Sequence, residues 1–326
     1  MNSSGPVQCS NINFTVDQTF LPVLYGCVFC VGLPVNILAL YGLYRLVKAN
    51  YTLSVFIINL LLSDLLHIST LPFWIDYYRR GHKWMFGYSA CRIIGYMFGT
   101  SLYASVCFMC CIALERYLAI VYPLWFRSHR RMKFACLLCL SVWVLVIAIQ
   151  SVGYSFGFER TRPASDLCLE SYPKSREFAV FQLVVMPFTF VLPVLLFGIL
   201  FARIHRSLHK ESFMPDRKKK RITHLLLLVL LIYVVIYGPY HVTAFALCIG
   251  ALVTSDRCRF ESDLFVFFRV TVGILSLNPV LDPILYAFIG NDFREALEYL
   301  LCWKKPRTAS IGRGSFHRVS YSIRET

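Results

Sequence analysis

Residues 91–120 read CRIIGYMFGTSLYASVCFMCCIALERYLAI, and no charged residue occurs between Arg92 and Glu115. A helix that crosses the hydrocarbon core of a bilayer needs about 20 consecutive, mostly apolar residues. This stretch is long enough, and the polar triplet Glu115-Arg116-Tyr117 lies at the end of its apolar part. We therefore interpret the stretch as a membrane-spanning helix with a charged terminus.

Six further segments have a similar length and composition: Phe20–Leu43, Leu53–Trp74, Ala135–Tyr154, Phe178–Ile204, Leu225–Val253 and Leu264–Ile289. Of the 326 residues, 57% are hydrophobic and 16% are charged, which is more apolar than a soluble domain of this size usually is. Buried helices of a large soluble protein do not account for the number and length of these segments. The sequence predicts an all-α membrane protein, a bundle of seven transmembrane helices.

The placement of basic residues predicts the orientation of the chain. Most of the 33 lysines and arginines follow the first, third, fifth and seventh spans, including the run Arg217-Lys218-Lys219-Lys220-Arg221. The positive-inside rule then puts the N-terminus outside the plasma membrane and the C-terminus in the cytoplasm. The net charge of +15 is explained by topology and by attraction to anionic lipid. No nucleic-acid partner is expected, because stacking platforms and groove-reading helices are not found.

Four parts of the chain are expected: a tail (1–19), the seven-helix domain (20–289), a short interfacial helix (290–302) and a disordered tail (303–326). Asn2-Ser3-Ser4 and Asn13-Phe14-Thr15 fit the N-glycosylation pattern, which is used on the lumenal side. Cys302 follows the amphipathic stretch Asp292–Leu301 and fits a palmitoylation site. Phosphorylation of the serine-rich tail would add charge for an arrestin-type partner.

Four of the 13 cysteines lie in segments assigned to the outer side: Cys9, Cys91, Cys168 and Cys258. An even number in an oxidising compartment suggests two disulfides. Three pairings are formally open, and we favour Cys91–Cys168 together with Cys9–Cys258. The first would pin the loop before the fifth span over the bundle, and the second would tie the N-terminal tail to the loop before the seventh span. Most of the other cysteines lie within spans, where cysteine behaves as a small hydrophobe.

Polar residues inside the spans are costly and therefore indicate function or a specific partner. Asp64 and Asp282 lie in the second and seventh spans, and Asn36, Asn59 and Asn278 lie at similar depth. If the helices pack together, these side chains can form one wet cluster that holds water or a sodium ion. A purely structural hydrogen-bond network is an equal alternative. Prolines also interrupt the spans, and Pro239 and Pro279 are predicted hinges of the sixth and seventh.

One motif in each span carries a more specific resemblance: Gly32-Leu33-Pro34-Val35-Asn36, Leu61-Leu62-Ser63-Asp64, Glu115-Arg116-Tyr117, Trp143, Pro193, Gly238-Pro239-Tyr240-His241 and Asp282–Tyr286. In this order they resemble a rhodopsin-like (class A) G-protein-coupled receptor over nearly the whole chain. The resemblance implies that Arg116 meets a heterotrimeric G protein once the sixth helix swings outward. It assigns Glu115, Tyr117, Asp282, Pro283 and Tyr286 to the same activation machinery. Tyr237 departs from the family, which usually has Trp or Phe there.

Two outer stretches, Leu71–Tyr78 and Cys168–Pro173, resemble the proton-sensing and lysolipid branch of these receptors, and Gly81-His82-Lys83-Trp84 resembles its member for lysophospholipids and oxidised fatty acids. Protonation of a histidine beside carboxylates would create new ion pairs that favour the active arrangement of the helices. The candidate histidines are His82, His241 and His67, and the candidate acids include Asp76 and Glu170. An anionic lipid would instead be gripped by cations, for which the candidates are Arg79, Arg80, Lys83, Arg92 and Arg269. For any one arginine an ordinary rim charge is the more frequent explanation, except for Arg269 within its apolar run.

The function that these observations favour is a receptor for a lysolipid or oxidised fatty acid, modulated by protons. A class A receptor for another anionic ligand, such as a nucleotide or lipid mediator, is the alternative. A transporter or channel would predict internal repeats or a continuous polar pathway, and neither is found. No nucleophile–base pair, phosphate loop or metal-spaced set occurs outside the spans, so the chain is not expected to be an enzyme or to need a cofactor.

Overall fold

The computed structural model describes residue 9 and residues 12–47, 52–129, 131–158, 167–210 and 216–289. Within this part, seven segments are long and apolar enough to cross a membrane, which confirms the predicted bundle. Its elements are α1 (Thr15–Val47), α2 (Thr52–Arg79), α3 (Gly87–Val121), α4 (Pro123–His129), α5 (Met132–Phe158), α6 (Arg176–Met186), the π-helical turn η1 (Pro187–Val191), α7 (Leu192–Lys210), α8 (Asp216–Val253), α9 (Arg257–Leu275) and α10 (Asn278–Ile289).

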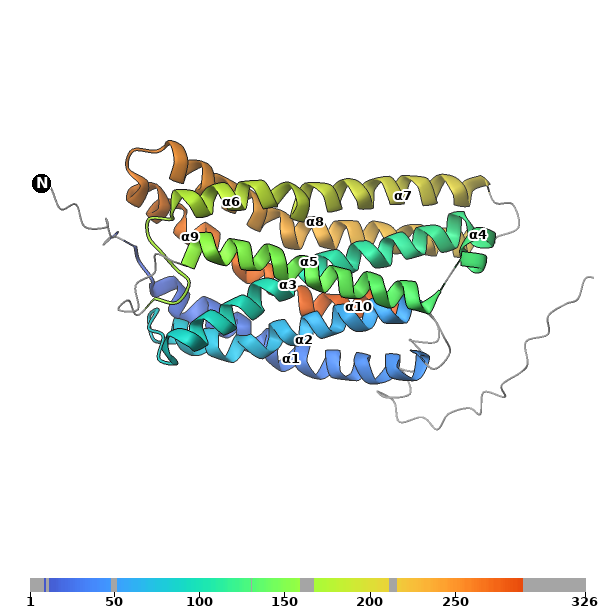
Figure 1. The fold of residues 1–326 in the computed structure, drawn as a ribbon, viewed down its shortest axis with the longest axis horizontal. Coiled ribbons are helices and arrows are strands. Elements are labelled where there is room, and N and C mark those ends of the chain that lie inside the picture. The colour runs from blue at the N-terminus through green and yellow to red at the C-terminus, as the bar shows by residue number, and fades with distance from the viewer. Residues whose placement is uncertain are drawn as a thin grey trace, which may run out of the picture.

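The spanning helices lie side by side along the long axis of the molecule (Figure 1). We call one end, where the links α2–α3 and α8–α9 and the loop 167–175 lie, the disulfide end. The other end, formed by the C-terminus of α3 and by the short helix α4, is called the Arg116 end. The expected interfacial helix 290–302, the tail 303–326, Asn2 and Cys302 lie outside the described residues.

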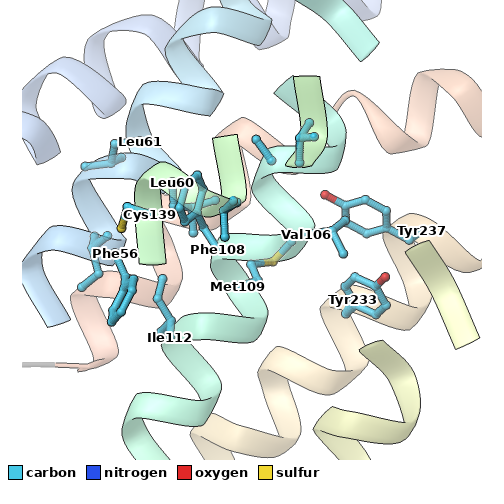
Figure 2. Close-up of a cluster of buried hydrophobic side chains, with 14 of the residues drawn as sticks. Phe56, Leu60, Leu61, Val106, Phe108, Met109, Ile112, Cys139, Tyr233 and Tyr237 are labelled. Carbon is cyan, nitrogen blue, oxygen red and sulfur yellow. The ribbon is translucent and has the colours of Figure 1, made fainter. Parts of the chain in front are cut away.

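The bundle has an apolar core and an apolar outer surface. In the core, Phe108 and Met109 of α3 pack with Leu60 of α2 and Tyr233 of α8 (Figure 2). Outward-facing side chains are apolar as well, and Val144 of α5 is 59% exposed. Because lipid is as apolar as these side chains, close packing and buried polar contacts hold such helices together.

Prolines divide two of the predicted spans. The fifth consists of α6, η1 and α7, and the seventh, which we predicted as one span over Leu264–Ile289 with a hinge at Pro279, consists of the two helices α9 and α10. Pro193 and Pro283 cannot donate to the carbonyls four residues earlier, those of Thr189 and Pro279. Side chains from other helices bind these two carbonyls: the Tyr233 hydroxyl donates to Thr189 O at 2.6 Å, and Asn36 Nδ2 donates to Pro279 O at 2.6 Å.

Two disulfides cross-link the disulfide end. Cys9 is bonded to Cys258 at the start of α9, and Cys91 of α3 is bonded to Cys168 in the loop before α6. This is the pairing that we favoured from the sequence. The loop is therefore fixed to α3, and the N-terminal segment is fixed to α9.

Candidate functional site

Four charged or titratable side chains meet beneath the disulfide end, and we call them the charge cluster: Asp17, His82, Glu170 and Arg269. They come from the first turn of α1, the link between α2 and α3, the loop after Cys168, and α9. Glu170 is 11% exposed at its side chain and the other three are 5% or less. Charges buried this deeply are stable only when each one has partners.

Arg269 holds both acids of the cluster. Its Nη2 lies 2.5 Å from Glu170 Oε1 and donates to the Tyr172 hydroxyl at 2.7 Å. Its Nε lies 2.9 Å from Asp17 Oδ2, an ion-pair contact without hydrogen-bond geometry. The Tyr78 hydroxyl accepts from Nη1 at 3.4 Å. The guanidinium that we considered for an anionic ligand is therefore already paired with two carboxylates of the protein.

His82 lies between the same two acids. Its Nδ1 is 2.7 Å from Glu170 Oε2, and its Nε2 is 3.2 Å from Asp17 Oδ2. Its backbone has a φ of 63°, a left-handed conformation that costs most residues about 1–2 kcal/mol. The Phe14 ring covers the imidazole, with ring centroids 4.1 Å apart. Because both ring nitrogens face carboxylates, this geometry favours the doubly protonated, charged imidazole.

His82 and Glu170, which lie in the links between helices, have pKa values shifted in opposite directions. Burial alone would lower the pKa of His82, but the contacts with Asp17 and Glu170 raise it above its usual value. Burial would raise the pKa of Glu170, yet Arg269 and His82 lower it to about 2. With His82 protonated, two positive groups balance two carboxylates. Loss of that proton leaves the buried cluster with a net negative charge.

This balance predicts a pH-dependent stability. Since the pKa of His82 is raised in the folded state, its stabilising contribution is complete below the unfolded pKa of about 6.5 and is lost as the pH rises through the folded pKa. We expect the thermal midpoint of the purified protein to fall by a few degrees across that window. His82→Gln should remove the dependence, whereas the exposed control His224→Gln should keep it. An equal pH dependence in both variants would contradict the assignment.

A cavity of about 360 Å³ extends from the charge cluster toward the centre of the bundle. Aromatic and aliphatic side chains supply much of its lining, among them Trp74, Phe98, Leu102, Phe178, Phe181 and Phe268. Two cationic side chains, Arg269 and Lys174, and two carboxylates, Glu170 and Glu261, also line it. A concave apolar site with a few convergent polar groups is typical of small-molecule binding sites.

The other histidine and acid candidates lie apart from the charge cluster. His241 lines the cavity, where its Nδ1 is 2.8 Å from the Tyr237 carbonyl and its Nε2 is 3.3 Å from the Thr189 hydroxyl. His67 is buried within α2 and contacts the Ser101 hydroxyl at 3.2 Å. Asp76, near the end of α2, pairs with exposed Arg80 just after that helix at 2.7 Å. Of the predicted acids, Glu170 alone meets a candidate histidine at ion-pairing distance within the described residues.

Four of the five predicted anion-binding cations lie outside the cavity lining. Arg79, Arg80, Lys83 and Arg92 are exposed and do not line the cavity, whereas Arg269 does. The guanidinium of Arg92 lies 5.7 Å from the ring centroid of Tyr88, away from the cavity. Their position is that of ordinary solvated charges at the rim of the bundle, the alternative that we gave from the sequence.

The polar residues in the middle of the bundle form a buried group. Asn278 Nδ2 donates to Asp282 Oδ2 at 2.9 Å, and the Ser105 hydroxyl donates to Asp64 Oδ1 at 3.4 Å. Buried polar atoms that remain without a protein partner in the described chain include Asp64 Oδ2, Asp282 Oδ1 and Asn36 Oδ1. Asn59 is not part of this group, because its Oδ1 accepts from Trp143 Nε1 at 2.9 Å. Water or a sodium ion among these atoms stays a prediction.

At the Arg116 end, Arg116 contacts its neighbour Glu115 only loosely, with Nε 4.0 Å from Oε2. Glu115 is buried, and its Oε1 accepts from the Thr52 hydroxyl of α2 at 3.1 Å. The Tyr117 ring lies edge-on to Tyr122, which follows α3. Pro283 is buried in α10, and the side chain of Tyr286 lies outside the described residues.

Our sequence reasoning did not single out two residues at the disulfide end. Asp17 belongs to the charge cluster, and it is the only acid among residues 1–19. Lys174 lines the cavity six residues after Cys168. Two features of the sequence could have pointed to these residues. Asp17 is the lone acid before the first span, and Lys174 is a cation on the loop that the disulfide fixes to α3. Asn13, the described glycosylation candidate, is exposed and accepts from the backbone N–H of Thr15 at 3.0 Å.

Residues 35–286 match the profile of a family described as 7 transmembrane receptor (rhodopsin family). Mouse G-protein coupled receptor 68 is 30% identical over 294 residues, which covers 89% of this chain and 78% of the relative. Human G-protein coupled receptor 65 is 29% identical over 337 aligned residues, covering 100% of this chain and 98% of the relative. A rat purinoceptor is 32% identical over 331 residues, covering 98% of this chain and 90% of the relative.

Proposed function

Because the chain belongs to the rhodopsin family of seven-transmembrane receptors, we propose that it is activated by a lysolipid or an oxidised fatty acid and modulated by protons. Membership of this family implies a multi-pass membrane receptor, not an enzyme, that couples to heterotrimeric G proteins. Beyond what family membership implies, we propose the class of ligand, the response to protons and the orientation in the membrane.

The proposed orientation has the disulfide end outside the cell. Cys9, Cys91, Cys168 and Cys258 are all oxidised at this end, and disulfides persist in oxidising compartments. The basic run 217–221 belongs to the start of α8, at the Arg116 end, which fits a cytoplasmic position. Glycosylation at Asn2 and Asn13, an interfacial helix at 290–302 with palmitoylated Cys302, and an arrestin-type partner for the tail 303–326 follow from the same orientation.

The observation that carries the lipid proposal is the cavity beneath the charge cluster. Its many aromatic and aliphatic side chains can surround an acyl chain, and Lys174 supplies a positive charge among them. A lysolipid or hydroxylated fatty acid has both parts, a long apolar chain and one acidic group. The pairing of an apolar slot with a cation therefore supports an anionic amphiphile.

A nucleotide is the second candidate, because the relatives include a purinoceptor. A nucleotide with several phosphates needs several cations at its binding site. Of the two cations that line the cavity, Arg269 is already paired with Asp17 and Glu170, which leaves Lys174. This charge balance favours a ligand with one acidic group over a nucleotide.

The proton response is assigned to His82 and the charge cluster. Protonation completes the charge balance of four side chains that come from α1, α9 and two links. A proton therefore favours the arrangement in which these segments are drawn together. His241, which lines the cavity, has no carboxylate at ion-pairing distance within the described chain and is a weaker candidate.

For the signal, we propose the movement of α8 that is usual in this family. Pro239 lies inside α8 and provides a hinge. Outward motion of the α8 segment at the Arg116 end would expose Arg116 to the G protein. Glu115, Tyr117, Asp282, Pro283 and Tyr286 remain the proposed partners of that step.

Second-messenger output tests the proposal in cells that express the receptor at matched surface levels. We expect lysophosphatidylcholine or hydroxylated linoleic acid to raise output at least severalfold over cells without receptor. Lowering the pH from about 8 to about 6 should change that response, because histidine titrates in this range. His82→Gln should flatten the pH curve and keep the lipid response. A response to neither lipid nor acid would refute the proposal, and a response to nucleotides alone would establish the second candidate.

A further inference from the structure

Lys174 is held rigidly at the wall of the cavity. Its backbone N–H donates to Glu261 Oε1 of α9 at 2.7 Å. The next residue, Ser175, caps α6, because its hydroxyl accepts from the N–H of Phe178 at 3.3 Å. Six residues earlier, Cys168 is bonded to α3. The backbone on either side of Lys174 is thus anchored to three different helices, which fixes the point from which its side chain extends.

The ammonium group of Lys174 has neutral partners among the described residues. Nζ donates to Gln182 Oε1 at 2.9 Å and lies over the rings of Phe178 and Phe268, at 5.6 and 5.5 Å from their centroids. Among the described residues, no carboxylate lies within ion-pairing distance of Nζ; Glu261, whose Oε1 accepts from the backbone N–H of this lysine, attracts the ammonium only from further away. Burial lowers the pKa of this amine. These observations describe a cation whose charge the protein only partly compensates.

The contrast with Arg269 identifies which of the two cavity cations is available to a ligand. Arg269 has two carboxylates and two tyrosine hydroxyls around it. Lys174 has one amide oxygen and two aromatic faces. An acidic ligand oxygen beside Lys174 would complete the coordination of the ammonium, whereas the same oxygen beside Arg269 would compete with Glu170.

We infer that Lys174, and not Arg269, binds the acidic group of the ligand, a carboxylate or phosphodiester whose acyl chain extends along the aromatic lining of the cavity. Gln182 acts with it, since its side-chain Oε1 accepts from the ammonium and orients it. The inference rests on the proposed function in that the ligand is an anionic amphiphile. It adds the residue that selects for the negative charge.

The test compares Lys174→Gln with Lys174→Arg, which keeps the charge, and with Lys83→Gln, which removes an exposed lysine of the same end outside the cavity lining. Surface level and thermal midpoint show whether each variant is folded. One readout is the potency of hydroxylated linoleic acid, of its uncharged methyl ester and of lysophosphatidylcholine in the second-messenger assay. The other is direct binding of a fluorescent fatty acid, cis-parinaric acid, to purified receptor in nanodiscs.

We expect Lys174→Gln to weaken binding and potency of the fatty acid roughly 10- to 100-fold, the usual effect of a hydrogen bond to a charged group. Lys174→Arg keeps the positive charge and should lose clearly less than Lys174→Gln, and Lys83→Gln should be unchanged. The methyl ester should be weaker on the wild type and insensitive to Lys174→Gln. A matching loss for lysophosphatidylcholine would extend the site to phosphodiesters, and a loss for the fatty acid alone would restrict it to carboxylates.

The outcomes separate this inference from the proposed function. Binding that depends on Lys174 without any lipid-evoked signal would uphold the site and refute the lipid agonist. A lipid-evoked signal and binding that are both unchanged in Lys174→Gln would overturn the inference and leave the proposed function standing. Absence of both binding and signal in the wild type would overturn both.

Discussion

Replacing Arg269 with leucine is expected to destabilise the folded protein by about 3–5 kcal/mol, the usual cost of removing one partner from a buried ion pair. Arg269 is the fixed cation between Asp17 and Glu170, at 2.9 and 2.5 Å, and its side chain is 5% exposed. Without it, two buried carboxylates face a single histidine. The thermal midpoint of purified protein and the surface expression should both fall sharply.

Two further variants make this result specific. Arg79→Leu removes an exposed arginine at the same end and should have little effect. The triple variant Asp17→Asn, Glu170→Gln, Arg269→Leu removes the charges on both sides and should recover part of the lost stability, since a fully neutral cluster avoids the uncompensated charge. An Arg269→Leu protein as stable as the wild type would show that the charge cluster does not support the fold.

Breaking the Cys91–Cys168 disulfide with Cys91→Ser is the second change with a large expected effect, about 2–5 kcal/mol. The bond holds α3 to the loop that carries Glu170, Tyr172 and Lys174. Its loss should therefore lower the thermal midpoint and also the potency of a lipid agonist. Both are measured on the receptor that still reaches the cell surface.

The control for this change is Cys27→Ser, which replaces an exposed free cysteine in α1 and should leave both measurements unchanged. If Cys91→Ser lowered stability but preserved agonist potency, the loop would hold its position without the covalent bond. In that case the contact between Lys174 N–H and Glu261 would be the stronger anchor of the loop.

The architecture was predictable because lipid imposes simple rules on a sequence. The length of the apolar segments indicated seven membrane spans, and seven spans in one chain indicated a helix bundle. Four outer cysteines indicated two disulfides and left three pairings open, of which the favoured one is present. A hinge at Pro279 was predicted, but the division of the span into α9 and α10 was not, because apolar composition alone does not reveal whether a helix restarts after an interruption.

The candidate site was only partly predictable, since charge pairing depends on which loops fold over the bundle. The sequence named both His82 and Glu170 as candidates, and the two side chains lie 2.7 Å apart, but their role in proton sensing stays a prediction. Arg269 was correctly singled out as unusual, but its partners are two carboxylates of the chain itself. Lys174 was not singled out, because the sequence does not show that the loop places this side chain at the cavity wall.

The hydrogen bond between the Tyr233 hydroxyl and the Thr189 carbonyl joins the π-helical turn of the fifth span directly to α8. Thr189 also meets His241, a cavity-lining residue of α8, through its own side chain. Thr189 thus gives the fifth span two contacts with α8, one through its carbonyl and one, at the wall of the cavity, through its hydroxyl. Because Pro193 cannot donate to the Thr189 carbonyl, that carbonyl is free to bind α8, so the interruption in the fifth span is also the point that joins it to the sixth.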